Sequence, residues 1–468
     1  MRRDHPSTDY HNRRVTVMGL GSFGGGVGAV KFLAARGARI TVTDTRTPDQ
    51  LAESLHALRG IPIEHWRLGE HITEDFITAD FVVVNPAVTR DHPLLKSCRE
   101  RDIPLTSEMN LFWQHNRGTV LAVTGSNGKS TTTALLHSIL QQTGRRCWLG
   151  GNLGHSLLPA VEEIAPDDLV ILELSSFQLA DLEKLQVSPH VGIVTNFSPN
   201  HLDWHGTLDD YRASKETILR WQTPADIAVL NADDAEVSSW PTKGLKLLFG
   251  LNDHGQWGIR WNGTSAVWRT AGRALSFPLH TWLTLPGRHN LANALAASAA
   301  ALAVGADVAA VQRGIETYQP LPHRLQLVGT AADRRFYNDS LATTPESTLV
   351  ALDAFADPII LIAGGYDKQV DLSSMARGIA SRTKAVALIG QTAPVLRAAI
   401  AAAPQSHTMI SPHLPDFETA FAWAVSQSAA GDVILLSPGC ASYDWFRHFA
   451  DRGTRFEHLV HQWIAAPT

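Results

Sequence analysis

The sequence predicts an α/β protein of several domains, each built on a largely parallel sheet. Its 468 residues are too many for one ordinary hydrophobic core, so two to four domains are expected. Short apolar runs rich in valine, isoleucine and leucine alternate with segments of helical spacing, which favours parallel strands joined by helices. Two glycine-rich turns, at 19–24 and 125–128, each stand between such a strand and a helix, as in doubly wound sheets.

The composition narrows the class of protein. Hydrophobic residues at 44% and charged residues at 18% are typical of a globular chain, and a net charge of −5 argues against nucleic acid as the main partner. The three cysteines, Cys98, Cys147 and Cys440, show no paired spacing, which fits a reducing compartment. The polar start MRRDHPSTDYHNRR is not a secretory signal, and no apolar run reaches membrane-spanning length. We therefore expect a cytoplasmic monomer that does not insert into membranes.

Residues 14–44 predict a strand, a glycine turn, a helix and a second strand. Gly19, Gly21 and Gly24 form a G-x-G-x-x-G pattern, and Asp44 ends the next strand, where dinucleotide folds place an acid that binds ribose. This pattern alone fits a nicotinamide-dependent oxidoreductase as well as a protein that binds another nucleotide diphosphate. Further strands are expected at 81–85 and 103–106.

The stretch TGSNGKST, residues 124–131, predicts a phosphate-binding loop. It follows the apolar run 119–123 and opens a helix expected at 129–142, so backbone N–H groups and the helix N-terminus would face one anion. Lys129 would reach the terminal phosphates and Ser130 would offer its hydroxyl to Mg²⁺. Val123 stands where the standard P-loop has a glycine, so the motif is a shorter variant. The residues predicted to bind ATP here are Gly125, Ser126, Asn127, Gly128, Lys129, Ser130 and Thr131.

The remaining elements continue the alternating pattern. Strands are expected at 168–174, 190–197 and 226–234, followed by an antiparallel edge within 240–285 and an alanine-rich helix at 287–305. Two prolines in YQPLP, 318–322, mark a hinge that we expect to move. A third α/β region follows, with the strands RRFYNDS, DPIILIAGG, KAVALIG and DVILLSPG.

Several polar residues follow strands at the edge where such sheets place ligands. Glu173 ends a strand, and a buried acid there needs a cation as its partner. We therefore favour the interpretation that Glu173 binds Mg²⁺ over the alternative that its carboxylate is solvated. His201 follows the next strand with Asp203 and His205 nearby, which favours metal or substrate binding over a structural role. Lys215 has the pattern of an ordinary surface lysine on a helix, and the sequence alone gives it no role.

Eight motifs occur in the order found in the Mur ligase superfamily, which the chain resembles over nearly its whole length. They are TGSNGKST, LELSSFQL, NHLDWHGT with YRASK, GRHNLAN, LPHR, NDS-x-AT, GGYDK and SPGCASYDWF. Enzymes of this superfamily use ATP to make amide bonds during peptidoglycan assembly or folate polyglutamylation. The resemblance implies a Rossmann-like domain for a UDP-linked substrate at 12–112, a central P-loop ATPase domain at 113–320 and a C-terminal Rossmann-like lid at 321–468.

The resemblance also implies roles for single residues. Lys129, His201, Lys215 and Arg324 match catalytic residues, and Lys215 matches a lysine that CO2 converts to a carbamate ligand of a second Mg²⁺. The metal ligands implied are Ser130, Glu173, His201 and carbamylated Lys215. Asn290 and Asn293, three residues apart on one helix, match asparagines that contact adenine, although Asn290 could equally cap the helix. Arg324 matches a residue that reaches the ATP phosphates, and Asp339 one that binds the ribose.

Within the superfamily the chain is most similar to the branch that adds glutamate to UDP-N-acetylmuramoyl-L-alanine. That branch transfers the γ-phosphate of ATP to the alanine carboxylate, and the glutamate amine then attacks the acyl phosphate. The residues matching the UDP-substrate site are Gly21, Ser22, Asp44, Thr45, Arg46, Asn85, Asn152 and His201. The residues matching the glutamate site are Thr343, Lys368, Ser442 and Phe449.

The sequence departs from the branch pattern at three places. Leu341 replaces a lysine and Thr344 an asparagine, and NPAV, 85–88, stands where S-P-G-I is usual. The lost cation at 341 favours the variant enzymes that add L-glutamate over the default D-glutamate, since inverting the Cα moves the α-carboxylate.

Three further functions fit the sequence less well. An oxidoreductase leaves TGSNGKST without a role, and folylpolyglutamate-type ligases usually lack an N-terminal nucleotide-binding domain. A non-catalytic nucleotide-binding regulator would have no use for Glu173, His201 and Lys215.

Overall fold

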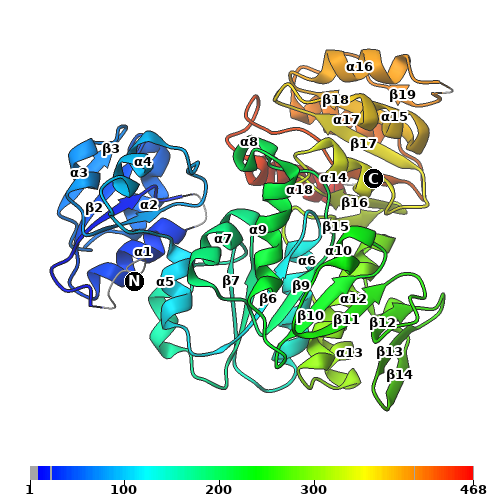
Figure 1. Cartoon of the computed structure of the whole chain (residues 1–468). Coiled ribbons are helices and arrows are strands. Elements are labelled where there is room, and N and C mark those ends of the chain that lie inside the picture. Colours follow the sequence, from blue (N-terminus) through cyan, green and yellow to red (C-terminus); the bar gives the residue numbers. More distant parts are fainter. Residues whose placement is uncertain (1–8, 22–23, 405, 467–468) are drawn as a thin grey trace. The chain divides into compact units, whose positions relative to one another are not determined.

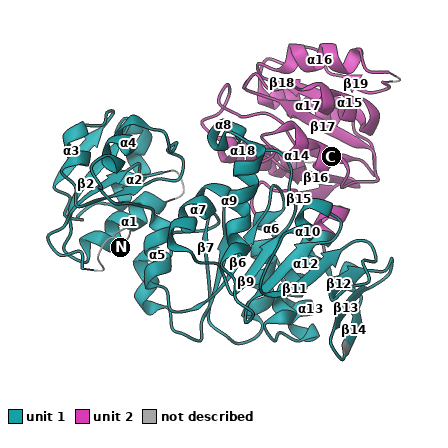
Figure 2. Ribbon diagram, viewed as in Figure 1, with its two compact units in different colours: residues 1–283, 292–318 teal, residues 284–291, 319–468 magenta. Residues whose placement is uncertain are grey.

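The computed structural model describes residues 9–21, 24–404 and 406–466. The chain divides into two compact units, coloured in Figure 2: residues 1–283 with 292–318, and residues 284–291 with 319–468. Figure 1 labels the helices and strands. The predicted α/β class is confirmed.

The first part of unit 1 contains a parallel sheet of five strands among the described residues, in the order β3-β2-β1-β4-β5. The strand order reverses between β1 and β4, and such switch points are where doubly wound sheets bind ligands. Gly19 follows β1 and Asn85 follows β4, so both lie at this point. The strands are β1 Arg14–Met18, β2 Arg39–Asp44, β3 His65–Leu68, β4 Phe81–Val84 and β5 Leu105–Thr106. The helices are α1 Gly25–Ala34, η1 Asp49–Leu51, α2 Ala52–Ala57, α3 Thr73–Ile77, α4 Pro93–Arg99 and α5 Glu108–His115.

The second part of unit 1 contains a sheet of nine strands in the described residues, ordered β14-β13-β12-β11-β10-β9-β6-β8-β7. Its parallel strands are buried on both faces, as the near-continuous apolar runs predicted. Strands β12 to β14 pair antiparallel, which confirms the predicted edge. The strands are β6 Thr119–Thr124, β7 Cys147–Gly151, β8 Leu169–Glu173, β9 Val191–Val194, β10 Ile227–Asn231, β11 Leu245–Gly250, β12 Gly258–Trp261, β13 Ala266–Thr270 and β14 Arg273–Phe277.

The helices of this part follow the predicted alternation. The alanine-rich helix α12, Arg288–Ala303, is present where it was expected, and its first four residues belong to unit 2. The others are α6 Lys129–Gln141, η2 Leu158–Glu163, α7 Ser176–Leu182, η3 Glu183–Leu185, α8 Leu202–His205, α9 Leu208–Arg220, α10 Ala235–Ser239, α11 Leu279–Trp282 and α13 Val308–Glu316.

Unit 2 contains a sheet of six strands in its described residues, ordered β15-β16-β20-β17-β18-β19. Only β15 and β16 pair antiparallel there, and apolar side chains from both faces form its two core clusters. The strands are β15 Gln326–Ala331, β16 Arg334–Asn338, β17 Ile359–Gly364, β18 Thr383–Ile389, β19 Met409–Ile410 and β20 Val433–Leu436. The helices are α14 Pro345–Leu352, α15 Ser373–Arg382, α16 Ala393–Ala401, α17 Phe417–Ser426 and α18 Phe449–Ala465.

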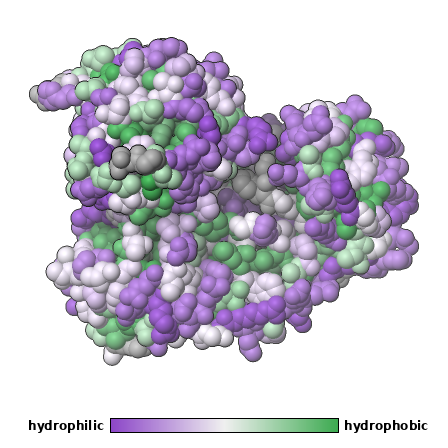
Figure 3. Space-filling view, turned by 180° about the vertical axis from the view of Figure 1, so that it is seen from behind, coloured by the Kyte–Doolittle hydropathy of each residue, from purple (hydrophilic) through white to green (hydrophobic). Residues whose placement is uncertain are grey.

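The surface mixes hydrophilic and apolar residues. On the face drawn in Figure 3, hydrophilic residues surround smaller apolar groups. Across the described residues, no helix combines the length and the apolar character needed to cross a membrane.

Candidate active site

The loop between β6 and α6 has the geometry of a phosphate cradle. Gly125 has φ +148° and Gly128 has φ +80°, backbone conformations that side chains rarely allow. A Cβ at Gly125 would collide with Thr195 Oγ1, and one at Gly128 with Asn293 Oδ1. Only glycine fits both positions, and the loop leads directly into the N-terminus of α6.

The segment after β9 holds this loop in place. Asn127 N–H donates to Asn196 Oδ1 at 2.9 Å, and the amide of Asn196 donates back to Asn127 O at 3.0 Å. Ser126 Oγ donates to Ser198 O at 2.9 Å, and Ser198 N–H donates to Ser126 Oγ at 2.8 Å. The Asn196 side chain and the Ser198 backbone therefore hold the loop conformation before any ligand binds.

Lys129 begins α6 and folds back over the loop. Its Nζ donates to Gly125 O and Ser126 O, each at 3.0 Å. Asn293 lies close by, since Thr132 Oγ1 donates to Asn293 Oδ1 at 3.3 Å. Ser130 and the buried Thr131 follow on the same first turn.

Glu173 ends β8 beside this loop and is 2% exposed. Its Oε1 accepts a hydrogen bond from Asn152 Nδ2 at 3.3 Å, and Asn152 N–H donates to Glu173 O at 2.8 Å. Its Oε2 is buried with no hydrogen-bond partner among the described residues. A buried carboxylate oxygen left in this way fits a cation.

Lys215, on α9, corrects the expectation from sequence. It is not a surface lysine but is 1% exposed, and its Nζ donates to Gly125 O at 2.8 Å. Burial lowers the pKa of Lys215 well below its usual 10.5; the charge of Lys129 lowers it further, while Glu173 opposes the shift. The helical pattern could not reveal this, because the loops that cover Lys215 come from distant parts of the sequence.

His201 and His205 differ although they flank one short helix. His201 has φ +53°, is exposed, and its ring lies 4.9 Å from that of Phe177. His205 is buried, and its Nε2 lies 2.9 Å from Ser176 Oγ. Burial, with the charges of His201 and Lys215, lowers the pKa of His205 to about 4. His205 is therefore a neutral residue that orients Ser176.

Asp44 is held by the glycine turn and by Arg46. Its Oδ2 accepts from Leu20 N–H at 3.0 Å and from Arg46 Nη2 at 2.9 Å, and its Oδ1 accepts from Arg46 Nε at 3.1 Å. Burial alone would raise the pKa of Asp44, but the hydrogen bonds from Arg46 and Leu20 outweigh it and lower the pKa. The carboxylate therefore fixes Arg46 beside the turn.

Asn85 faces the same turn from the end of β4. Its Oδ1 accepts from Ala87 N–H at 3.0 Å, and its Nδ2 lies where a side chain at Gly21 would begin. Thr45 is exposed next to Arg46. Ser22, the other residue expected here, lies outside the described residues.

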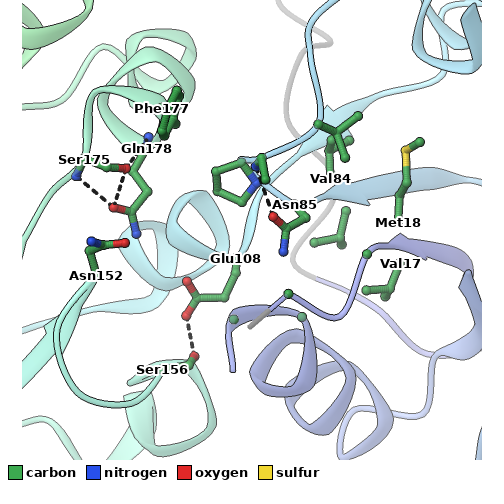
Figure 4. A pocket seen from close by; sticks show the side chains of 18 of the residues that line it. Val17, Met18, Val84, Asn85, Glu108, Asn152, Ser156, Ser175, Phe177 and Gln178 are labelled. Atoms are coloured by element: carbon green, nitrogen blue, oxygen red, sulfur yellow. Dashed lines mark hydrogen bonds between the residues drawn. The ribbon is translucent and has the colours of Figure 1, made fainter. Parts of the chain in front are cut away.

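One cavity of about 550 Å³ in unit 1 joins these groups (Figure 4). The predicted residues that line it are Gly21, Asp44, Thr45, Arg46, Asn85, Lys129, Asn152, His201 and Lys215. Residues that line it without having been predicted as site residues include His71, Glu108, Ser156, Ser175, Phe177 and Gln178. Ser175 and Gln178 form a capping box at the start of α7, and this S-x-x-Q pattern after the β8 strand was a signal in the sequence. His71 and Glu108 left no such signal.

Unit 2 carries the remaining residues predicted to bind ATP. Asn290 is buried and its Nδ2 donates to Pro286 O at 2.7 Å, as expected of a residue that orders the start of α12. Asp339 follows β16; its Oδ1 accepts from Leu325 N–H at 3.1 Å and its Oδ2 from Ser437 Oγ at 2.8 Å. Burial raises the pKa of Asp339 to about 7, against these hydrogen bonds and the charge of Arg324.

Three of the residues predicted to bind glutamate, Thr343, Lys368 and Ser442, lie on loops at the carboxyl ends of unit 2 strands, and the fourth, Phe449, is the first residue of α18. Lys368 is exposed after β17, Ser442 is buried after β20, and Thr343 and Phe449 are half-buried. Leu341 is half-buried, and its N–H donates to His323 O at 3.0 Å.

Arg452, which the sequence did not single out, joins two of these loops. Its Nε and Nη2 donate to Ser340 Oγ and Ser340 O at 3.0 and 2.9 Å. Its Nη1 donates to Cys440 O and Ala441 O at 3.1 and 3.4 Å. Burial lowers the pKa of Arg452 to about 10, so it remains charged at neutral pH.

No cluster of three or more His, Cys, Asp or Glu side chains able to hold a metal occurs in the described part of the chain. Mg²⁺ at phosphoryl-transfer sites commonly takes one or two protein carboxylates, with phosphates and waters as its other ligands. Glu173, with its unpartnered Oε2, fits that kind of site.

Three family models together match most of the chain. The Mur ligase MurD-like N-terminal domain matches residues 13–107, the Mur ligase middle domain residues 123–301, and the Mur ligase glutamate ligase domain residues 323–440. The chain belongs to the Mur ligase superfamily. Its N-terminal match assigns it to the MurD-like branch, and the predicted class of enzyme, an ATP-dependent ligase, is confirmed.

Curated relatives agree over nearly the full length. The chain is 41% identical over 460 residues to a UDP-N-acetylmuramoylalanine–D-glutamate ligase of Roseiflexus sp. (strain RS-1), covering 96% of this chain and 98% of that one. It is 37% identical over 472 residues to the enzyme of the same name from Geobacillus kaustophilus (strain HTA426), covering 98% and 99%.

Solved structures share the fold at lower identity. The UDP-N-acetylmuramate–alanine ligase MurC of Thermotoga maritima aligns with a TM-score of 0.63 at 20% identity, covering 96% of this chain and 100% of that one. MurF of Acinetobacter baumannii aligns with a TM-score of 0.58 at 19% identity, covering 98% and 93%.

Proposed function

We propose that this Mur ligase joins glutamate to UDP-N-acetylmuramoyl-L-alanine at the expense of ATP. The observation that carries the proposal is the single cavity that joins the glycine turn with Asp44 and Arg46 to the phosphate loop with Lys129 and Lys215. Such a cavity suits a long ligand with a nucleoside diphosphate at one end and a reacting carboxylate at the other. The names of the curated relatives support the same substrate class.

The chain's own residues would act on the transferring phosphoryl group by position and charge. The N–H groups of the loop 125–131 would hold the ATP phosphates, and Lys129 would exchange its two carbonyl partners for the terminal phosphates. The γ-phosphate would pass to the alanine carboxylate. The glutamate amine would then attack the acyl phosphate carbonyl, and phosphate would leave from the tetrahedral intermediate.

We propose two Mg²⁺ sites beside the phosphate loop, held by Ser130, Glu173, His201 and carbamylated Lys215; His201 and Lys215 also line the cavity. The unpartnered Glu173 Oε2 supports the first, and the buried position of Lys215 supports the second. When bound, these ions would offset the negative charge on the phosphate oxygens.

The carbamate proposal rests on the state of the Lys215 amine. A lysine whose pKa lies well below 10.5 is neutral more often and so is a better nucleophile toward CO2. The amine nitrogen would bond to the carbon of CO2 and release one proton, which turns the side chain into an anion. That anion could bind a cation, whereas the ammonium would repel it.

Unit 2 would supply the rest of the binding groups. We propose that Arg324, Asp339 and Asn290, with Asn293 of unit 1, contact ATP, and that Thr343, Lys368, Ser442 and Phe449 bind glutamate. Asp339, Thr343, Lys368 and Ser442 lie on loops after β16, β17 and β20, and Asn290 and Phe449 lie at the starts of helices, which supports this assignment; Arg324 lies just before β15.

We propose L-glutamate as the amino acid, with D-glutamate as the alternative. Leu341 stands where the branch pattern has a lysine, so the loop that also carries Thr343 lacks that positive charge. A site for the other enantiomer would need its positive charges at different positions. The curated relatives are named for D-glutamate, so the enantiomer is the part of the proposal that most needs a direct measurement.

The test is an ADP-release assay with UDP-N-acetylmuramoyl-L-alanine and a panel of amino acids that includes both glutamates. Glutamate should be the preferred amino acid, and L-glutamate should exceed D-glutamate in kcat/KM by about a hundredfold, or roughly 2.7 kcal/mol. A preference for D-glutamate would overturn only the assignment of L-glutamate and would leave the rest of the proposed function standing. Absence of turnover with either glutamate, when another amino acid reacts, would overturn the substrate assignment. Light scattering of the same preparation would check the expected monomer.

A further inference from the structure

Glu108 is a buried acid in the cavity of unit 1 that the proposed chemistry leaves without a role. It is the first residue of α5, the helix that connects the five-stranded sheet to the nine-stranded one. Its Oε1 accepts a hydrogen bond from Ser156 Oγ, and its Oε2 lies 3.9 Å from where a Cβ on Gly25 would stand. Figure 4 shows the carboxyl pointing into the cavity, between Asn85 on one side and Asn152 on the other.

No charged side chain among the described residues forms an ion pair with this carboxyl. Burial raises the pKa of Glu108 to about 7, and only the hydrogen bond from Ser156 opposes the shift. The elements packed against α5 are α1, η2 and α7. In the part of the chain that the structure describes, none of the titratable side chains of these elements or of the same cavity forms a hydrogen bond or ion pair with the Glu108 carboxyl; they are Lys31, Glu162, Glu163, Asp181, Asp44, Arg46, His71, Lys129, His201, Tyr211 and Lys215.

The proposed ligand would push this acid further toward its neutral form. A diphosphate and a carboxylate bring negative charge into the cavity, and the ligand displaces water from it; both effects disfavour a second anion. A neutral carboxyl group has one O–H donor and remaining acceptor capacity. An amino sugar, with hydroxyl groups and an N-acetyl amide, offers partners for both.

We propose that Glu108 contacts the amino sugar of the UDP-linked substrate as a neutral acid and donates a hydrogen bond to it. The proposal rests on the proposed function and adds to it a residue that recognises the amino sugar, the middle part of the substrate. Glu108 lies between residues that face the diphosphate end and residues that face the reacting end, so the sugar is the part of the substrate within its reach.

The test is calorimetric binding of UDP-N-acetylmuramoyl-L-alanine to the full chain at pH 8, in two buffers of different ionisation enthalpy. The wild type should take up close to one proton on binding. Glu108→Gln should keep its affinity within about threefold and take up none, because an amide can donate without titrating. Glu108→Ala should bind the full substrate at least tenfold more weakly but bind UDP, which lacks the amino sugar, as the wild type does. Glu74→Gln, the same change in the exposed first turn of α3, serves as the matched control.

Two results would overturn the role of Glu108. Equal proton uptake by the wild type and Glu108→Gln would show that this carboxyl does not change state. An equal loss of affinity for UDP, the full substrate and ATP in Glu108→Ala, with a lowered melting temperature, would show a structural role only. Failure of the proposed function would show itself separately, as a wild-type chain that releases no ADP with this substrate.

Discussion

Lys215 in unit 1 and Arg452 in unit 2 are both cations buried to 1% exposure, and neither forms an ion pair with a carboxylate among the described residues. They differ in the number of hydrogen-bond acceptors around the charged group and in the size of the pKa shift. Lys215 Nζ donates to Gly125 O, and the pKa of Lys215 falls well below the usual value. Arg452 donates to four acceptors on two loops, and its pKa of about 10 keeps it charged.

The acceptors around a buried cation decide whether the cation keeps its proton. A buried ammonium with few acceptors is costly, so Lys215 is held in a state that readily loses its proton. A guanidinium that satisfies several carbonyl groups ties their loops together. The same burial therefore has opposite consequences for the charge, according to how many acceptors surround the cation.

The largest expected effect is the loss of Lys215. Lys215→Ala should lower kcat on the order of 10²- to 10³-fold, because the proposed carbamate stabilises the transferring charge. Added acetate should restore part of the activity by replacing the anion, while Lys215→Arg should remain inactive. Lys243→Ala, a change at an exposed lysine, is the control. A fully active Lys215→Ala enzyme would contradict the carbamate.

Replacing Lys129 tests whether Lys129 acts as a cation while Lys215 acts as an anion, its carbamate. Lys129→Ala should lower kcat about a hundredfold or more, equivalent to about 3 kcal/mol, because a positioned cation is lost. Acetate should not rescue this variant. Steady-state kinetics of both alanine variants with and without acetate measure the difference. Near-normal activity in folded Lys129→Ala would refute the phosphate-loop assignment.

The main expected effect of replacing Arg452 is a lower free energy of unfolding of unit 2. Arg452→Met leaves Ser340 O and Cys440 O without their donor and should destabilise unit 2 by about 3 kcal/mol, read from urea unfolding. Arg452→Lys should recover only part, since an ammonium lacks the planar fork. The KM for glutamate should rise more than the KM for the UDP-substrate, because the affected loops carry Thr343 and Ser442. Arg447→Met, at an exposed arginine, should change neither quantity.

The smallest effect is a difference in pH dependence. The folded state of Lys215 binds fewer protons than the unfolded state at every pH between its lowered pKa and 10.5, so stability rises with pH across that window. Lys215→Met should therefore be more stable than the wild type at pH 7, and the gap should shrink by at most about 1.4 kcal/mol per pH unit toward pH 10. The window of Arg452 lies above pH 10, so Arg452→Met should show no such trend between pH 7 and 9. Unfolding in buffer free of Mg²⁺ and CO2 measures both, and a gap for Lys215→Met that does not change with pH would contradict the lowered pKa.

Much of the fold could be read from local pattern. The run LVILE at β8 is apolar at almost every position because a parallel strand is covered on both faces, so it was predicted to within one residue at each end. Strands β3, β7, β15 and β19 were not predicted from the sequence. Their sequences contain exposed residues, glycines or a mixture of polar and apolar residues, and such segments form strands only beside a neighbouring strand. The phosphate loop was recognisable because its glycines and its lysine are adjacent in sequence.

By itself, the sequence determined the α/β class, the order of motifs that placed the chain among the Mur ligases, and the identity of the loop at 124–131. Those features depend on residues that are close along the chain, where periodicity and turn chemistry act. Only the tertiary structure decided that Lys215 is buried, that Glu108 lies uncompensated in the cavity, and that Arg452 joins two loops. The hydrogen-bond partners of these three residues lie on other elements of the fold, from 11 residues away for Arg452 and Ala441 to 112 for Arg452 and Ser340. A side chain's charge state follows from those neighbours rather than from its own sequence context.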